Sequence, residues 1–182
     1  MYRILLVDED LAVTSSLARL LHCTPLVVLG REWRCDVETF DSPIKALARM
    51  GVRGFDLALS GFHMAEMDGV ELLRRIQELQ PNAARVLLSS YADLNGLIGA
   101  INEAKIDRFI TKPWQDFDLI STLGMILERR GLHLANQALT QHVGREYCDL
   151  SPVERERHRL EQLEPGITKV QWGPDGEVVM EP

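Results

Sequence analysis

The sequence predicts a doubly wound α/β domain followed by a helical extension and a terminal β-hairpin. Over residues 1–130, five short runs of β-type residues alternate with five amphipathic stretches. Two of these runs, 4–7 and 86–88, are continuously apolar, which is typical of central strands covered by helices on both faces. Polar residues directly follow the runs, at the edge where the carboxyl ends of parallel strands meet.

Each element has its own local signal. Four to six residues with branched or aromatic side chains, bounded by acids, Gly or Pro, predict strands at 3–7, 35–40, 55–59, 85–89 and 108–111. Apolar residues three and four positions apart predict helices near 11–21, 43–50, 69–79, 94–101 and 117–127. Ser42 before Pro43 is a helix-start signal, as is Asp68 with Glu71. Five βα units in series predict right-handed crossovers and a parallel sheet.

Composition excludes several classes of protein. The 182 residues are 46% hydrophobic, enough to bury a core, and 27 acids against 20 bases give a net charge of −7. An acidic chain is poorly suited to bind nucleic acid, because such binding requires Lys and Arg side chains that neutralise the phosphates. Three scattered cysteines indicate reduced thiols rather than a disulfide framework. No signal peptide or membrane helix is expected, so we expect a cytoplasmic protein without nucleic-acid or membrane partners.

Four predicted strands end in polar or small residues. Asp8 and Glu9 follow the first, Gly61 the third, Ser89 and Ser90 the fourth, and Lys112 the fifth. Each alone is an ordinary loop residue. An acid pair, a hydroxyl and a lysine at successive strand ends are much less expected by chance, and they predict a common site.

Four segments carry a family resemblance: YRILLVDED, FDLALSGFHMAEMDGVELLRRI, RVLLSSYADL and FITKPW. Residues 1–130 resemble the receiver domain of bacterial two-component response regulators, in the subgroup with a TKPW ending that often stands beside phosphodiesterase-type or regulatory outputs. The resemblance implies a flavodoxin-like (βα)5 fold with strand order 2-1-3-4-5. It also implies phosphoryl transfer from a histidine kinase to an aspartate, with Mg²⁺ bound by nearby acids.

The sequence departs from this family at the phosphoacceptor. When Met67-Asp68-Gly69 is set against the family's Met-Asp-Gly ending, Gly61 takes the aspartate position and Ala65 that of the usual proline. Glycine has no carboxylate to attack phosphorus, and Mg²⁺ loses an anionic ligand. Asp56 lies about 16 Å away along the strand, and Asp68 is expected to cap a helix. We therefore expect a pseudo-receiver with no catalytic residue, no enzymatic activity and no cofactor.

The remaining site residues keep the family's types. By resemblance, Asp8 and Glu9 are the acid pair and weak Mg²⁺ candidates, Ser89 is the phosphoryl-binding hydroxyl, Phe109 the switch aromatic and Lys112 the lysine. With one carboxylate missing, Lys112 is predicted to pair directly with Asp8 or Glu9. The resemblance also suggests a cis Lys112-Pro113 bond. A carboxyl group filling the space at Gly61 would count against the pseudo-receiver interpretation.

Two regions have no counterpart in these motifs. The link over residues 23–34 is longer than the family's, and its Trp33 either packs on the core or offers a docking aromatic. After residue 130 an apolar stripe predicts a helical extension over 131–164, with Gly131 a weak point and a new helix start at Ser151-Pro152. Gly173-Pro174-Asp175-Gly176 predicts a hairpin within 165–182. The stripe fits a homodimer, or a helix folded back on the receiver.

Three functions follow from these observations. The leading one is a signalling adaptor, homodimeric through its C-terminal helices, that contacts a sensor kinase or output protein. By resemblance its contact face is formed by residues 94–101, 108–111 and 117–127. The alternatives are an active receiver phosphorylated on a non-standard acid, and a binder of small anions or nucleotides at the strand ends.

Overall fold

The structure is a computed structural model that describes residues 1–90, 104–149, 151–163, 171–172 and 178–179. The helix expected over 94–101 lies outside these residues. The chain divides into two compact units, Met1–Leu134 and Ala135–Pro182. Among the described helices, none has the length and apolar character needed to cross a bilayer.

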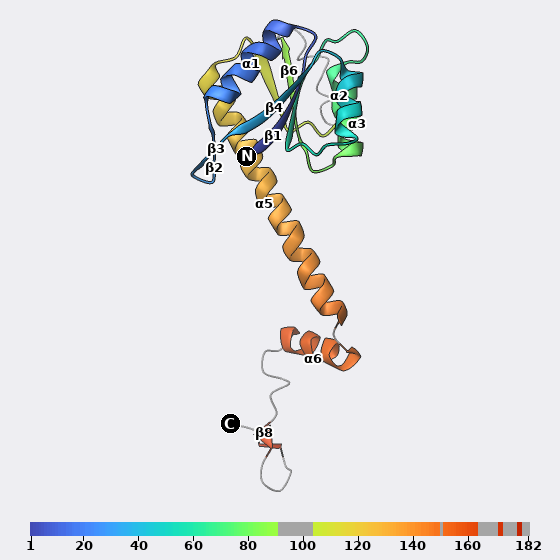
Figure 1. Ribbon diagram of the computed structural model, residues 1–182. Helices are drawn as coiled ribbons and strands as arrows, with labels where there is room; N and C mark the ends of the chain where they lie inside the picture. Colours follow the sequence, from blue (N-terminus) through green and yellow to red (C-terminus); the bar gives the residue numbers. More distant parts are fainter. Residues whose placement is uncertain (91–103, 150, 164–170, 173–177, 180–182) are drawn as a thin grey trace. The chain divides into compact units, whose positions relative to one another are not determined.

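A five-stranded parallel sheet forms the centre of the first unit (Figure 1). Its strands, in spatial order, are β4 (Cys35–Phe40), β1 (Tyr2–Val7), β5 (Leu57–Gly61), β6 (Ala84–Ser90) and β7 (Arg108–Lys112). Counting these five along the chain, the order is second, first, third, fourth, fifth. The third strand was predicted at 55–59 and is observed at Leu57–Gly61, two residues later. Ser60 and Gly61 belong to the strand, although their residue types are typical of a loop. The Ser60 hydroxyl is satisfied within the strand by the Gly61 carbonyl at 2.9 Å.

Helices cover both faces of this sheet. They are α1 (Leu11–Cys23) and α5 (Asp116–Asp149) on one face, and α2 (Pro43–Met50) and α3 (Gly69–Leu79) on the other. Ile4 and Leu6 of β1 join the core beside α1 and α5, whereas Leu5 and Val7 join the core beside α2 and α3. The prediction that 4–7 is a central strand buried on both faces is therefore confirmed.

The predicted helix starts are confirmed by their hydrogen bonds. Asp68 accepts the Glu71 amide at 2.8 Å and so caps α3, and Ser42 caps α2 ahead of Pro43. Asp10 caps α1 by accepting the Ala12 amide at 2.8 Å. These side chains satisfy backbone donors that the first turn of a helix leaves open. Asp68 is engaged as a cap and does not replace the missing carboxylate.

The link over 23–34 contains a hairpin that the sequence did not predict. Strands β2 (Leu26–Val28) and β3 (Arg31–Trp33) pair antiparallel. Leu29 turns the chain at a φ of 52°, a conformation for which leucine gives no sequence signal. Leu26 is buried in the core, and Trp33 packs on that core with its ring centroid 5.3 Å from that of Tyr2. Of the two roles left open for Trp33, core packing is the one observed.

Two glycines of α5 are expected to respond oppositely to alanine. A Cβ at Gly124 would lie 2.6 Å from the Val27 carbonyl oxygen of the hairpin, whereas a Cβ at Gly131 meets nothing within 4 Å. Gly124→Ala is expected to destabilise the protein by about 1–3 kcal/mol through overpacking, less the gain in helix propensity. Gly131→Ala is expected to stabilise it by up to about 1 kcal/mol. Urea unfolding checks both, and a stabilising Gly124→Ala would mean that the hairpin is not seated on α5.

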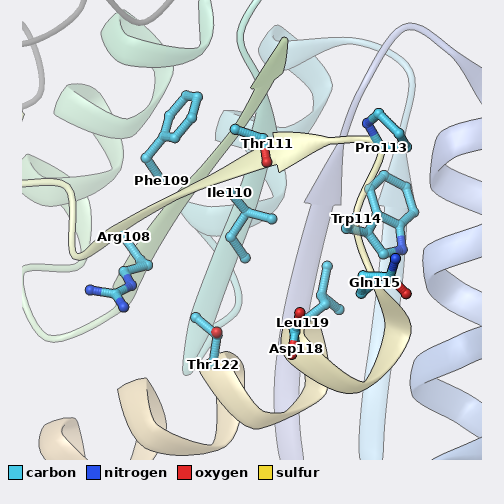
Figure 2. Close-up of a pocket in the computed structure, with 10 residues that line it drawn as sticks. All are labelled: Arg108, Phe109, Ile110, Thr111, Pro113, Trp114, Gln115, Asp118, Leu119 and Thr122. Carbon is cyan, nitrogen blue, oxygen red and sulfur yellow. The ribbon is translucent and has the colours of Figure 1, made fainter. Parts of the chain in front are cut away.

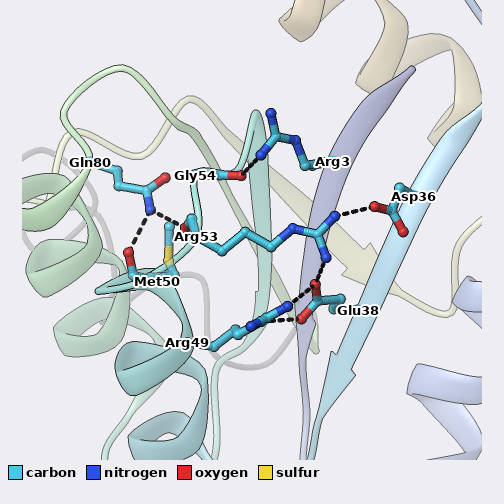
Figure 3. A network of polar contacts seen from close by, with 8 residues as sticks. All are labelled: Arg3, Asp36, Glu38, Arg49, Met50, Arg53, Gly54 and Gln80. Carbon is cyan, nitrogen blue, oxygen red and sulfur yellow. Dashed lines mark hydrogen bonds and ion pairs between the residues drawn. The ribbon is translucent and has the colours of Figure 1, made fainter.

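An ion-pair network fastens the edge strand β4 to α2 (Figure 3). Arg49 donates two hydrogen bonds to Glu38, at 2.7 and 3.0 Å, and Arg53 pairs with both Glu38 and Asp36. Gln80 holds the end of α2 by donating to the carbonyls of Met50 and Arg53. The network places charge on β4, which pairs only with β1 and so forms one edge of the sheet.

Glu38 makes stability depend on pH. Its hydrogen bond with Arg49, and the charges of Arg49 and Arg53, hold the pKa of this carboxyl below its ordinary value of 4.5. A lowered folded-state pKa stabilises the protein above pH 4.5, and this contribution disappears as the pH falls through the folded-state value. Thermal unfolding between pH 7 and pH 3 is therefore expected to show a shallower acid decline for Glu38→Gln than for wild type. Equal slopes would contradict this role.

Helix α5 continues through Gly131 without interruption. Arg129 pairs with Asp107, and Arg130 pairs with Asp56 at 3.0 Å, which holds this part of the helix to the amino ends of the strands. In the second unit, α6 (Pro152–Leu163) begins with the predicted capping box: the Ser151 amide donates to Glu154 at 2.9 Å, and the Glu154 amide donates back to the Ser151 hydroxyl at 3.3 Å. Strands β8 (Gln171–Trp172) and β9 (Val178–Val179) pair antiparallel.

Candidate functional site

The carboxyl ends of β1, β5, β6 and β7 place the candidate residues at one edge of the sheet. Asp8 directly follows β1, Gly61 ends β5, Ser89 lies in β6 opposite Thr111, and Lys112 ends β7. Because all these strands are parallel, their ends share one side of the sheet. The predicted common site is therefore built by the topology.

Lys112 pairs with Asp8, one of the two partners predicted for it. The Lys112 ammonium donates to Asp8 Oδ2, and the backbone N–H of Asp10 donates to Oδ1 at 3.0 Å. Asp8 is only 4% exposed, so its charge is compensated inside the protein rather than by water. The Lys112-Pro113 peptide bond is cis, as the resemblance suggested.

The Asp8 carboxyl group fills the space that a side chain at position 61 would need. A Cβ built on Gly61 would lie 2.8 Å from Asp8 Cγ, closer than real Cβ atoms approach. A carboxyl group in this space counts against a pseudo-receiver, and the structure places one there. It belongs to the first residue of the acid pair, and both of its oxygens accept hydrogen bonds.

Glu9 has a partner that the sequence did not reveal. The backbone N–H of Ala65, in the loop between β5 and α3, donates to Glu9 Oε1. In the sequence Ala65 stands out only as a replacement for the family's proline, and the missed signal is that this replacement creates an N–H. Glu9 therefore contacts the loop, and Asp8 is the residue that pairs with Lys112.

Ser89 and Phe109 complete the set of predicted residues. Ser89 is 3% exposed, and Phe109 is partly buried against the core beside α3. Figure 2 shows Phe109 on the opposite side of β7 from Ile110, which packs against the core beside α5. A hollow of about 320 Å³ lies along this strand, lined by Arg108, Phe109, Ile110, Thr111, Pro113, Trp114, Gln115, Asp118, Leu119 and Thr122.

The residues present do not fit the magnesium ion that the family implies. Mg²⁺ requires about six oxygens in octahedral geometry. Gly61 supplies no side-chain oxygen, Asp8 is bound by Lys112 and Asp10, and Glu9 is bound by Ala65. Within the described part of the chain, no three His, Cys, Asp or Glu side chains gather so as to hold a metal.

Comparisons with known proteins give the family. The model of the response regulator receiver domain matches residues 4–124. The transcriptional regulatory protein ZraR of Klebsiella oxytoca is 32% identical over 115 residues, 63% of this chain and 24% of ZraR. The hydrogenase transcriptional regulatory protein HoxA of Cupriavidus necator is 30% identical over 154 residues, 85% of this chain and 29% of HoxA. The chain thus spans about a quarter of the length of these relatives.

A solved structure agrees with this match. The signal receiver domain of an HD domain-containing protein from Pseudomonas fluorescens Pf-5 is 31% identical, with a TM-score of 0.64 over 74% of this chain and 92% of that one. The sheet, the polar strand ends and the family match agree with one another. The chain belongs to the response regulator receiver domain family of two-component signalling.

Proposed function

We propose that this chain is a pseudo-receiver: a cytoplasmic, non-enzymatic signalling adaptor that works through protein contacts without aspartyl phosphorylation. The observation that carries the proposal is the pairing of Lys112 with Asp8, which is 4% exposed, beside a glycine that supplies no carboxylate at position 61. In this arrangement the lysine already has an anionic partner, and the position of the nucleophile offers no oxygen. Both features oppose formation of an acyl phosphate.

Intact mass after incubation with acetyl phosphate and Mg²⁺ tests this proposal. The wild-type protein is expected to keep its mass. A gain of about 80 Da, the mass of one phosphoryl group, would overturn the proposal. Lys112→Arg is a matched control, because it keeps the positive charge beside Asp8 while changing the donor geometry.

Phosphorylation of Asp8 is the second candidate function, and one observation favours it. Asp8 brings a carboxylate into the space at position 61. However, both of its oxygens accept hydrogen bonds and the residue is 4% exposed, so attack on phosphorus requires it to leave Lys112 or Asp10. Peptide mapping of a phosphorylated product distinguishes this candidate, because it places the phosphoryl group on Asp8. The alternative of an anion binder is weakened, because its cation, Lys112, pairs with Asp8.

The partner surface that we propose is the side of β7 and α5. The hollow along these elements combines Trp114 and Ile110 with the charged residues Arg108 and Asp118 (Figure 2). Phe117, at the start of α5, is 80% exposed. Apolar side chains next to both signs of charge suit a protein surface such as that of a sensor kinase or an output protein.

We also propose that a second copy of the chain covers the outer part of α5. Residues 131–144 contain no Asp, Glu, Lys or Arg, yet Leu132 and Leu139 are 53% and 63% exposed. An uncharged helical face is matched by the same face of another copy, because neither buries an unpaired charge. Helix α6 is less suited to cover it, because Arg and Glu dominate its sequence.

Light scattering on the full chain tests this pairing. Wild type is expected at twice the chain mass, and Leu132→Glu/Leu139→Glu at the chain mass. Gln137→Glu/Gln141→Glu is the matched control, because it adds the same two charges about half a turn away on the helix and leaves the dimer intact. A monomeric wild type would overturn this pairing.

A further inference from the structure

The two acids of the site are engaged by different parts of the chain. Asp8 is held by Lys112 from β7, in the space left by Gly61. Glu9 is held by the Ala65 N–H from the loop after β5. Neither acid depends on the partner of the other.

The Ala65 contact depends on a feature of the backbone. The resemblance places a proline at this position, and proline has no N–H to donate. Alanine restores the donor, and the Glu9 carboxylate accepts it in a charge-assisted hydrogen bond. The substitution of alanine for proline therefore supplies the N–H group that binds Glu9.

The same loop is fastened at two further points. The Ser42 hydroxyl, which caps α2, donates to Glu66 at 2.5 Å, and the Gly69 N–H donates to the Phe62 carbonyl at 2.8 Å. Ala65 and Glu66 thus bind two separate parts of the fold: Glu9, which follows β1, and Ser42, which caps α2. The loop over residues 62–68 is held across its length.

We infer that Gly61 and Ala65 disable the acid pair independently, and that the Glu9–Ala65 contact is a latch on the loop over residues 62–68. Restoring an aspartate at position 61 alone leaves Glu9 bound by the loop. Removing the Ala65 N–H alone frees Glu9 but supplies no carboxylate at position 61. This inference rests on the proposed function, since it adds a second change, at Ala65, to the missing carboxylate at position 61.

Amide hydrogen exchange at Ala65 tests the latch without any metal. In wild type, exchange at this amide is expected to be at least about tenfold slower than in Glu9→Ala, because exchange requires the hydrogen bond to open. Glu9→Gln is the matched control, because its amide oxygen still accepts the bond and is expected to retain protection. Equally fast exchange in wild type and Glu9→Ala would overturn the latch.

Mg²⁺ titration followed by calorimetry tests the independence of the two defects. Gly61→Asp/Ala65→Pro is expected to bind Mg²⁺ at least about tenfold more tightly than Gly61→Asp, which corresponds to about 1.4 kcal/mol. Equal affinities in two folded variants would overturn the inference. If Ala65→Pro does not fold, the exchange experiment still decides whether the Ala65 N–H holds Glu9. A phosphorylated wild type would instead refute the proposed function, and it leaves the Ala65 exchange result unchanged.

Discussion

Replacing Lys112 by methionine is expected to destabilise the receiver unit by about 3–5 kcal/mol, because it leaves a buried carboxylate without its cation. Asp8 is 4% exposed, and without Lys112 its carboxylate keeps the hydrogen bond from the Asp10 N–H. A loss of this size is a large fraction of the stability of a typical domain. Urea unfolding at pH 7 measures it.

Replacing Asp8, the acid of this pair, is expected to destabilise the protein less than replacing Lys112. Asp8→Asn retains an oxygen for the Asp10 N–H and leaves Lys112, whose side chain is 28% exposed, able to reach water. We expect Asp8→Asn to lower the free energy of unfolding by about 1–2 kcal/mol. The double variant is expected to be less destabilised than the sum of the two, by about 1.5–3 kcal/mol of coupling. If Lys112→Met is no more harmful than Asp8→Asn, the burial of Asp8 does not determine the energetics of this pair.

Gly61→Asp is expected to give the site a metal affinity that the wild-type residues do not support. The introduced Cβ meets the Asp8 carboxyl group, so Asp8 must rotate away from its present position and its contact with Lys112 must change. Two carboxylates then face the same space, and they are the ligand type that Mg²⁺ prefers. We expect Mg²⁺ to bind at least about tenfold more tightly than to wild type.

Gly61→Ala distinguishes the effect of displacing the Asp8 carboxyl group from the effect of adding a carboxylate that binds the metal. Its Cβ also displaces the Asp8 carboxyl group but supplies no oxygen, so we expect lower stability and unchanged Mg²⁺ affinity. With acetyl phosphate present, Gly61→Asp is expected to gain about 80 Da and Gly61→Ala to keep its mass. An equal gain of metal affinity in both variants would show that freeing Asp8, rather than adding a carboxylate, restores the site.

Local sequence signals predicted most of the elements. The apolar run at 4–7 is a central strand with alternate residues in the two cores, and the caps at Ser42 and Asp68 begin α2 and α3. These features depend on neighbours within a few residues. The hairpin at Leu26–Trp33 was missed, because its strands are three residues long and, of its two turn residues at positive φ, Gly30 has a turn preference but Leu29 has none.

The candidate site was predicted in its membership but only partly in its contacts. Strand ends and the family resemblance located Asp8, Gly61 and Lys112, and predicted that Lys112 would pair with an acid. They left open which acid it would be. They also missed that the Asp8 carboxyl group fills the space at Gly61.

The sequence by itself determined the alternation of strands and helices, the absence of a carboxylate at position 61 and the neutral stretch over residues 131–144. Only the tertiary structure decided how the two acids are satisfied. Lys112 lies 104 residues from Asp8, and Ala65 lies 56 residues from Glu9. Contacts over such separations depend on how the packed sheet places each backbone atom and on the space that an absent Cβ leaves, neither of which is encoded in local residue spacing.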